Sequence, residues 1–125
     1  MKKIISTSSA PSAIGPYSQA VQVGDMLYLS GQIPLNPQSM EIEVDDVASQ
    51  TEQVMANIKA VLAVANATLE NVVKCTIFLK DMNDFATVNE VYGKYFAENP
   101  PARSCVEVAR LPRDVKVEIE CIAKL

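Results

Sequence analysis

The stretch that decides the fold covers residues 47–79 and reads VASQTEQVMANIKAVLAVANATLENVVKCTIFL. Its first part spaces apolar residues at the period of an α-helix, so that one face carries Val47, Val54, Ile58, Val61, Leu62 and Ala65. Asp45 or Asp46 can cap the start of this helix, and Asn66, which tolerates a left-handed backbone, stands where it should end. The second part, residues 72–79, is rich in β-branched residues. The stretch therefore predicts a helix followed by a strand.

The chain on the C-terminal side continues with a helix and two strands. Apolar residues again recur at helical spacing, and they are Phe85, Val88, Tyr92, Tyr95 and Phe96. We expect this second helix to begin near Asn83 or Asp84, and Pro100-Pro101 to interrupt the chain after it. The last two strands are predicted over residues 103–109 and 115–123.

The chain on the N-terminal side predicts three strands, over residues 2–6, 19–23 and 26–30. Gly24-Asp25 forms a short hairpin turn, and proline and glycine mark loops over residues 7–16 and 31–46. The resulting order predicts a single α+β domain over residues 1–125. Two helices can cover only one face of its six-stranded sheet, so the other face must meet water or a partner.

Composition excludes several functional classes. No apolar stretch approaches the ~18 residues of a membrane span, and lysine and arginine are scattered through a chain of net charge −4, which argues against a nucleic-acid partner. The chain has no histidine, which removes Ser-His-Asp and Cys-His chemistry and the commonest metal ligand. Four glycines form no phosphate-binding motif. Any catalysis must therefore use carboxylates, arginine, tyrosine, backbone groups and water.

The cysteines indicate a reducing compartment. Cys75, Cys105 and Cys121 are odd in number, far apart in the sequence and without a Cys-x-x-Cys pair. A disulfide framework is not expected from such a pattern, and reduced thiols in a cytoplasmic protein are the simpler interpretation.

Strand alternation suggests one candidate site. If Val106 and Val108 face the helices, Arg103 and Cys105 lie on the opposite face. In the last strand an apolar row alternates with the polar residues Glu118 and Glu120, which would share that helix-free face with Arg103. A guanidinium there could bind an anionic substrate through two hydrogen bonds. Periodicity alone favours the alternative, in which these charges are solvated or form a surface salt bridge.

Five motifs add information that periodicity lacks, because together and in this order they resemble the RidA/YjgF family. They are AIGPYSQA at residues 13–20, SGQIP at 30–34, NDFATVN at 83–89, PARSCVEVA at 101–109 and VEIE at 117–120. The resemblance implies a six-stranded mixed sheet backed by two helices, a chorismate-mutase-like fold assembled as a homotrimer with clefts between subunits. It also implies hydrolysis of 2-iminopropanoate and 2-iminobutanoate to 2-oxo acids and ammonia, which protects pyridoxal-phosphate enzymes, without metal or other cofactor.

The resemblance also implies roles for individual residues. Arg103 would bind the substrate carboxylate and Glu118 would position or activate the attacking water. The remaining predicted site residues would hydrogen-bond substrate or water through the backbone or line the cleft, and they are Tyr17, Ser30, Gly31, Asn89 and Cys105. Where many family members have glycine, this chain has Ser39-Met40-Glu41, and because methionine disfavours a positive φ the conformation of this loop stays open.

Two other functions remain alternatives at this point. A regulatory protein on the same fold could use Arg103 to bind a small carboxylate without catalysis. An RNA-directed activity has been attributed to some relatives, and the acidic composition argues against it. Retention of Arg103 does not distinguish an enzyme from a binding protein, because both need a cation for the carboxylate.

Overall fold

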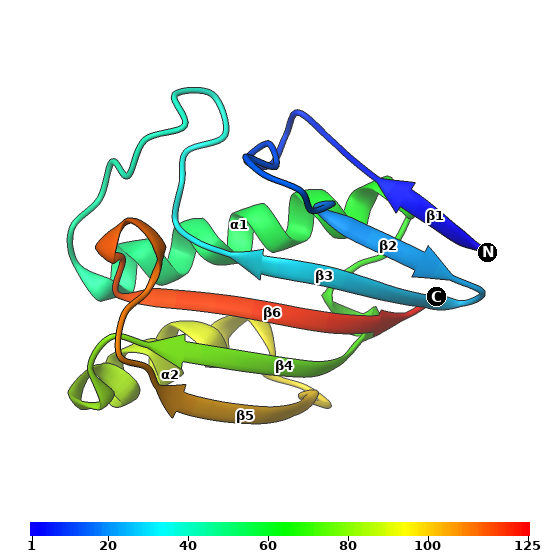
Figure 1. The fold of residues 1–125 in the computed structure, drawn as a ribbon. Coiled ribbons are helices and arrows are strands. Elements are labelled where there is room, and N and C mark those ends of the chain that lie inside the picture. The colour runs from blue at the N-terminus through cyan, green and yellow to red at the C-terminus, as the bar shows by residue number, and fades with distance from the viewer.

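The computed structural model describes residues 1–125 and contains the predicted six-stranded sheet. The strands follow one another across the sheet in the order β1-β2-β3-β6-β4-β5 (Figure 1). Their bounds are Lys2–Ile5 (β1), Ala20–Val23 (β2), Met26–Gln32 (β3), Val72–Leu79 (β4), Ala102–Glu107 (β5) and Val117–Lys124 (β6). Only β4 and β5 pair in parallel, so the sheet is mixed as expected.

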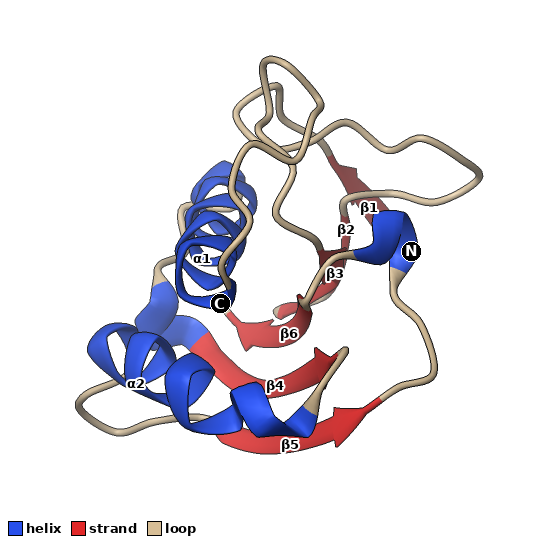
Figure 2. Ribbon diagram, turned by 90° about the vertical axis from the view of Figure 1, so that its left-hand side faces the viewer, coloured by secondary structure: helices blue, strands red, loops and turns tan.

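Two helices, α1 (Val47–Val64) and α2 (Phe85–Tyr95), lie on the same side of the sheet (Figure 2). Asp46, not Asp45, caps α1, because its carboxylate accepts a hydrogen bond of 2.8 Å from the Ser49 backbone N–H. Asn66 follows the helix with a φ of 56°, which confirms the left-handed stop predicted from the sequence. No helix of the structure combines the length and the apolar character needed to cross a bilayer.

The core lies between the helices and the sheet. Its fully buried side chains include Val54, Ile58 and Leu62 from α1, which confirms the face predicted from the helical spacing. Opposite them, every second residue of β6 is buried, from Val117 to Ala123, and Glu118 and Glu120 point away from the helices. The prediction of the two faces of β6 is therefore confirmed.

The prediction of which face of β5 meets the helices is wrong. Arg103 pairs in register with the buried Cys75, and Val106 pairs with Phe78, which faces away from the helices. Arg103 and Cys105 therefore lie on the helix-covered side, and Val106 is 42% exposed on the other. The prediction assumed that apolar residues of a strand face the helices. At this edge strand the arginine instead packs on aromatic rings of α2, and valine is left on the uncovered face.

The structure also corrects the predicted start of β6 and shows the conformation of the loop at Ser39-Met40. Residues 112–114 form a 3₁₀ turn, so β6 begins at Val117 and not at residue 115. The loop at Ser39-Met40, whose conformation the sequence left open, places Met40 at a φ of 58°, so this residue adopts the left-handed conformation that glycine favours. The main chain on both sides of Met40 is hydrogen-bonded, with Met40 N donating to the carbonyl of Asn36 at 2.8 Å.

Candidate functional site

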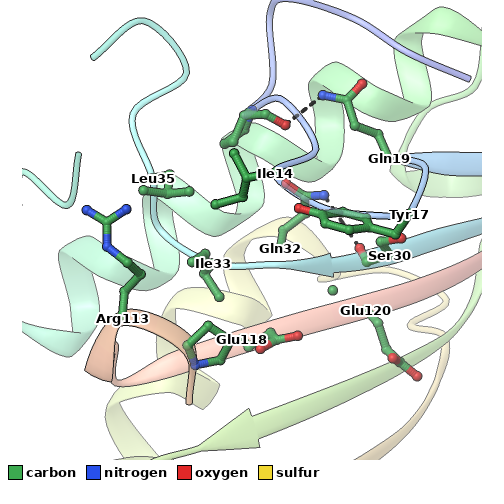
Figure 3. Close-up of a pocket in the computed structure, with 13 residues that line it drawn as sticks. Ile14, Tyr17, Gln19, Ser30, Gln32, Ile33, Leu35, Arg113, Glu118 and Glu120 are labelled. Atoms are coloured by element: carbon green, nitrogen blue, oxygen red, sulfur yellow. Dashed lines mark hydrogen bonds between the residues drawn. The ribbon is translucent and has the colours of Figure 1, made fainter. Parts of the chain in front are cut away.

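A cavity of about 490 Å³ lies beside the C-terminal end of β3 (Figure 3). It is bounded by the loop before β2, the end of β3 with the chain that follows, the turn before β6, and β6 itself. Its apolar wall comes from Pro11, Ile14, Ile33, Leu35 and Pro112. Its polar lining comes from Tyr17, Gln19, Ser30, Gly31, Gln32, Arg113, Glu118 and Glu120. Four of the seven predicted site residues therefore meet here.

Gly31 and Glu118 approach each other closely in this cavity. A Cβ atom placed on Gly31 would overlap the Oε2 atom of Glu118 and lie 2.9 Å from its Cδ. The register of β3 and β6 shifts between Leu29 and Gln32, and this irregularity contains Gly31. Only a residue without a side chain leaves the carboxylate room against the backbone at this point.

Glu118 is a half-buried carboxylate without a compensating cation in its own chain. Neither a hydrogen bond nor an ion pair reaches it from another side chain. Burial, and secondarily the charge of Glu120, raises the pKa of Glu118 above its usual value. Arg113, the cation in the cavity lining, is bound to Glu41 at 3.1 Å. A carboxyl group with a raised pKa facing a cavity is suited to accept and return a proton.

Polar contacts hold the loop that carries Tyr17 against β3. The buried Gln19 side chain donates hydrogen bonds to the carbonyls of Pro11 at 2.7 Å and Ala10 at 3.3 Å. Ser30 donates from its hydroxyl to the Ser18 carbonyl at 2.6 Å. Tyr17 lies beside Ser30 at the cavity and is 50% exposed (Figure 3). The half-exposed ring leaves this side of the cavity open to a further molecule.

The other predicted site residues form a separate cluster between α2 and β5. The Nη1 group of Arg103 donates a hydrogen bond of 2.7 Å to Oδ1 of Asn89. Cys105 packs partly against the core, and burial raises the pKa of its thiol, with Arg103 opposing this effect. The thiol therefore stays protonated near neutral pH, which does not favour a role as nucleophile.

The two clusters do not meet within one chain. Glu118 faces away from the helices, and Arg103 lies under α2 on the helix-covered side. The expectation that Arg103 and Glu118 share one face is therefore wrong, and Arg103 does not offset the charge of Glu118 within one chain. The prediction also overlooked Phe85 and Tyr92, whose rings contact Arg103. Their spacing with Asn89 on one helix face was the available signal.

Comparison with known proteins identifies the family. The model of the family described as Endoribonuclease L-PSP matches residues 7–125. A 2-iminobutanoate/2-iminopropanoate deaminase of Escherichia coli is 54% identical over 98% of both chains, and Protein DfrA of Myxococcus xanthus is 59% identical over 98% of this chain and 95% of its own.

Solved structures agree with this. Escherichia coli TdcF with bound serine has a TM-score of 0.94 at 50% identity over 98% of both chains. RidA from a Psychrobacter species has a TM-score of 0.95 at 45% identity over 98% of this chain and 99% of that one. With one family model over nearly the whole chain and full-length relatives far above 30% identity, the chain belongs to the RidA/YjgF family, whose family model is described as endoribonuclease L-PSP.

Proposed function

We propose that this protein hydrolyses reactive 2-imino acids, namely 2-iminopropanoate and 2-iminobutanoate, to 2-oxo acids and ammonia. The observation that carries the proposal is the uncompensated, half-buried Glu118 carboxylate held against Gly31 in a cavity. The Escherichia coli relative that carries the deaminase name matches over 98% of the chain. Removal of such imines would protect the pyridoxal-phosphate enzymes that release them.

The reaction needs a placed water, a proton carrier and a cation. An imine carbon is electrophilic, so water forms the new C–O bond while Glu118 accepts a proton from it. The proton passes to the nitrogen of the tetrahedral intermediate. A second proton, from the new hydroxyl group, reaches the same nitrogen through Glu118 as the C–O double bond forms and the C–N bond breaks. Ammonia leaves with the electron pair of that bond, and the 2-oxo acid remains. Arg103 would hold the substrate carboxylate through two parallel hydrogen bonds.

A complete site then requires two chains, since one chain holds Arg103 and Glu118 on different sides of its sheet. We propose a homotrimer in which the Arg103 cluster of one subunit faces the Glu118 cavity of the next. The helix-free face supports an assembly, because Tyr28 and Val106 are more than two-fifths exposed there. The number three comes from the family resemblance, and the half-exposed Tyr17 would lie at the junction.

The structure offers less support to an RNA-directed activity. Glu118 and Glu120 both line the cavity, and their negative charge would repel a phosphate backbone. Binding of a small carboxylate without catalysis would use Arg103 in the same way but leaves the placement of Glu118 unexplained. Small imino acids are therefore the proposed partners. We also propose a cytoplasmic location, which the three free thiols favour.

A coupled assay tests the proposed function. A serine dehydratase generates 2-aminoacrylate, which tautomerises to 2-iminopropanoate, and the decay of the imine is followed with and without this protein. We expect faster decay with matching release of pyruvate and ammonia. Unchanged decay together with saturable binding of 2-oxobutanoate would instead support the binding protein and overturn the enzyme.

A further inference from the structure

The guanidinium of Arg103 is held by one stripe of α2. Its Cζ atom lies 5.5 Å from the ring centre of Phe85 and 5.0 Å from that of Tyr92. Asn89 accepts a hydrogen bond from Nη1 between these two contacts along the helix. The three α2 residues are four and three positions apart, which places them on one helix face.

All three residues of α2 that contact this cation are uncharged. Arg103 forms no ion pair with a carboxylate of its own chain. A carboxylate partner would fix the guanidinium but would also compete with an incoming anion for the same N–H groups. Aromatic faces attract the cation through their quadrupole without using its N–H donors, and Asn89 occupies one nitrogen of the group. The remaining donors stay available to a ligand carboxylate.

The two rings differ in how firmly the fold holds them. Tyr92 is buried and packs on Phe96 in a tilted arrangement with ring centres 4.7 Å apart, so its position is fixed by the core. Phe85 stands at the first residue of α2 and is 36% exposed. Tyr92 therefore contacts the guanidinium from the buried side in a fixed position, and Phe85 contacts it from the solvent side.

We propose that Phe85 and Tyr92 are positioning residues that form an aromatic clamp on Arg103, which orients its guanidinium to receive the substrate carboxylate. The clamp acts through Arg103 and touches no reacting atom. This inference rests on the proposed function only in naming the carboxylate as substrate. A clamp of this kind affects binding of the carboxylate, so its loss raises KM and leaves the chemistry at Glu118 in place.

Replacement of Phe85 separates the effect of the aromatic π face from the effect of side-chain size. Phe85→Leu keeps an apolar side chain without a π face, and we expect KM to rise about fivefold, equal to about 1 kcal/mol, with kcat within about twofold. Phe85→Trp offers a stronger π face and should restore the KM of the wild type. Tyr95→Leu is the matched control, because Tyr95 is an aromatic of the same helix that contacts Lys59 and Glu52 instead. It should leave KM unchanged.

Fluorescence gives a readout that does not depend on turnover. The chain contains no tryptophan, so Phe85→Trp introduces a single tryptophan beside Arg103, which can be excited selectively over the four tyrosines. Titration with 2-oxobutanoate should change its emission saturably, and the added substitution Arg103→Ala should abolish that change. Melting temperatures of all variants would be measured alongside.

The results separate the clamp from the proposed function. An unchanged KM in Phe85→Leu, or a fall in kcat alone, overturns the clamp even if the wild type hydrolyses imines. An Arg103-dependent fluorescence response in a protein that hydrolyses no imine supports the clamp and overturns the deaminase. A response that persists in Arg103→Ala also overturns the clamp, because the carboxylate then binds elsewhere.

Discussion

Gly31→Ala should separate catalysis from stability. The added Cβ would overlap Oε2 of Glu118 and lie 2.9 Å from Cδ and 3.2 Å from Cγ. The carboxylate must therefore retreat by about 1 Å, and a misplacement of that size costs roughly 10²-fold in rate, or about 2.7 kcal/mol of transition-state stabilisation. We expect kcat in the imine assay to fall by about that factor.

The same substitution should have little effect on the fold. Gly31 does not have the positive φ found at Gly24, so alanine can adopt its backbone conformation. The atoms in its way belong to the end of a flexible side chain that is only partly buried. Reduced freedom of the unfolded chain favours the variant by roughly 0.4–1 kcal/mol. The free energy of unfolding should therefore stay within about 1 kcal/mol of the wild type.

Gly93→Ala is the matched control. Its Cβ would meet nothing within 4 Å, and its position inside α2 predicts a gain of about 0.5–1 kcal/mol in stability with unchanged kcat. A double-mutant cycle with Glu118→Ala then identifies the route of the effect. Gly31→Ala should cost less than about twofold once the carboxylate is gone. A rate within threefold of the wild type in the single variant, or an undiminished loss in the Glu118→Ala background, would refute the reasoning.

Three further predictions follow from the placement of the charged residues. Arg103→Ala should lower kcat/KM by about 10²-fold in a folded protein, and Arg103→Lys should also be poor because a point charge cannot form the paired hydrogen bonds; activity near that of the wild type would exclude Arg103 as the carboxylate anchor. Because the folded pKa of Glu118 is raised, the wild type should lose kcat as the pH falls through that pKa and should lose some stability as the pH rises through it. In pH–rate profiles and melting temperatures, Glu118→Gln should abolish both trends and Glu120→Gln should keep them. The opposite ranking would identify Glu120 as the proton acceptor. Mixing inactive Arg103→Ala and Glu118→Gln chains should restore about a quarter of the sites in a shared-site trimer, whereas no recovery after subunit exchange, with exchange confirmed by mass, would show that each chain holds its own site.

The helices could be predicted because each has a strong local signal. The apolar face of residues 47–65, the cap at Asp46 and the stop at Asn66 are all properties of the sequence near each position. The faces of β6 were equally accessible, since its apolar row is uninterrupted. The start of β6 was harder to predict, because the 3₁₀ turn at residues 112–114 depends on backbone angles that no propensity indicates.

The site could be predicted as a list of residues but not as an arrangement. The alternation of side chains along a strand predicts that Arg103 and Val106 lie on opposite sides of the sheet. It does not predict which of the two residues points toward the helices. That choice depends on aromatic rings of α2 that accept a guanidinium, a contact between segments distant in the sequence. The approach of Gly31 to Glu118 likewise depends on the irregular register between β3 and β6.

The central position of β6 also affects how the chain folds. This strand pairs with β3 on one side and β4 on the other, joining residues as distant in the chain as Leu29 and Cys121. Pairings of such long range close slowly, which places this fold among the slower small domains. Until β6 docks, β3 and β4 each present an open strand edge, and such edges favour aggregation. Refolding yield should therefore fall as protein concentration rises, because the intermediate that still lacks its middle strand aggregates.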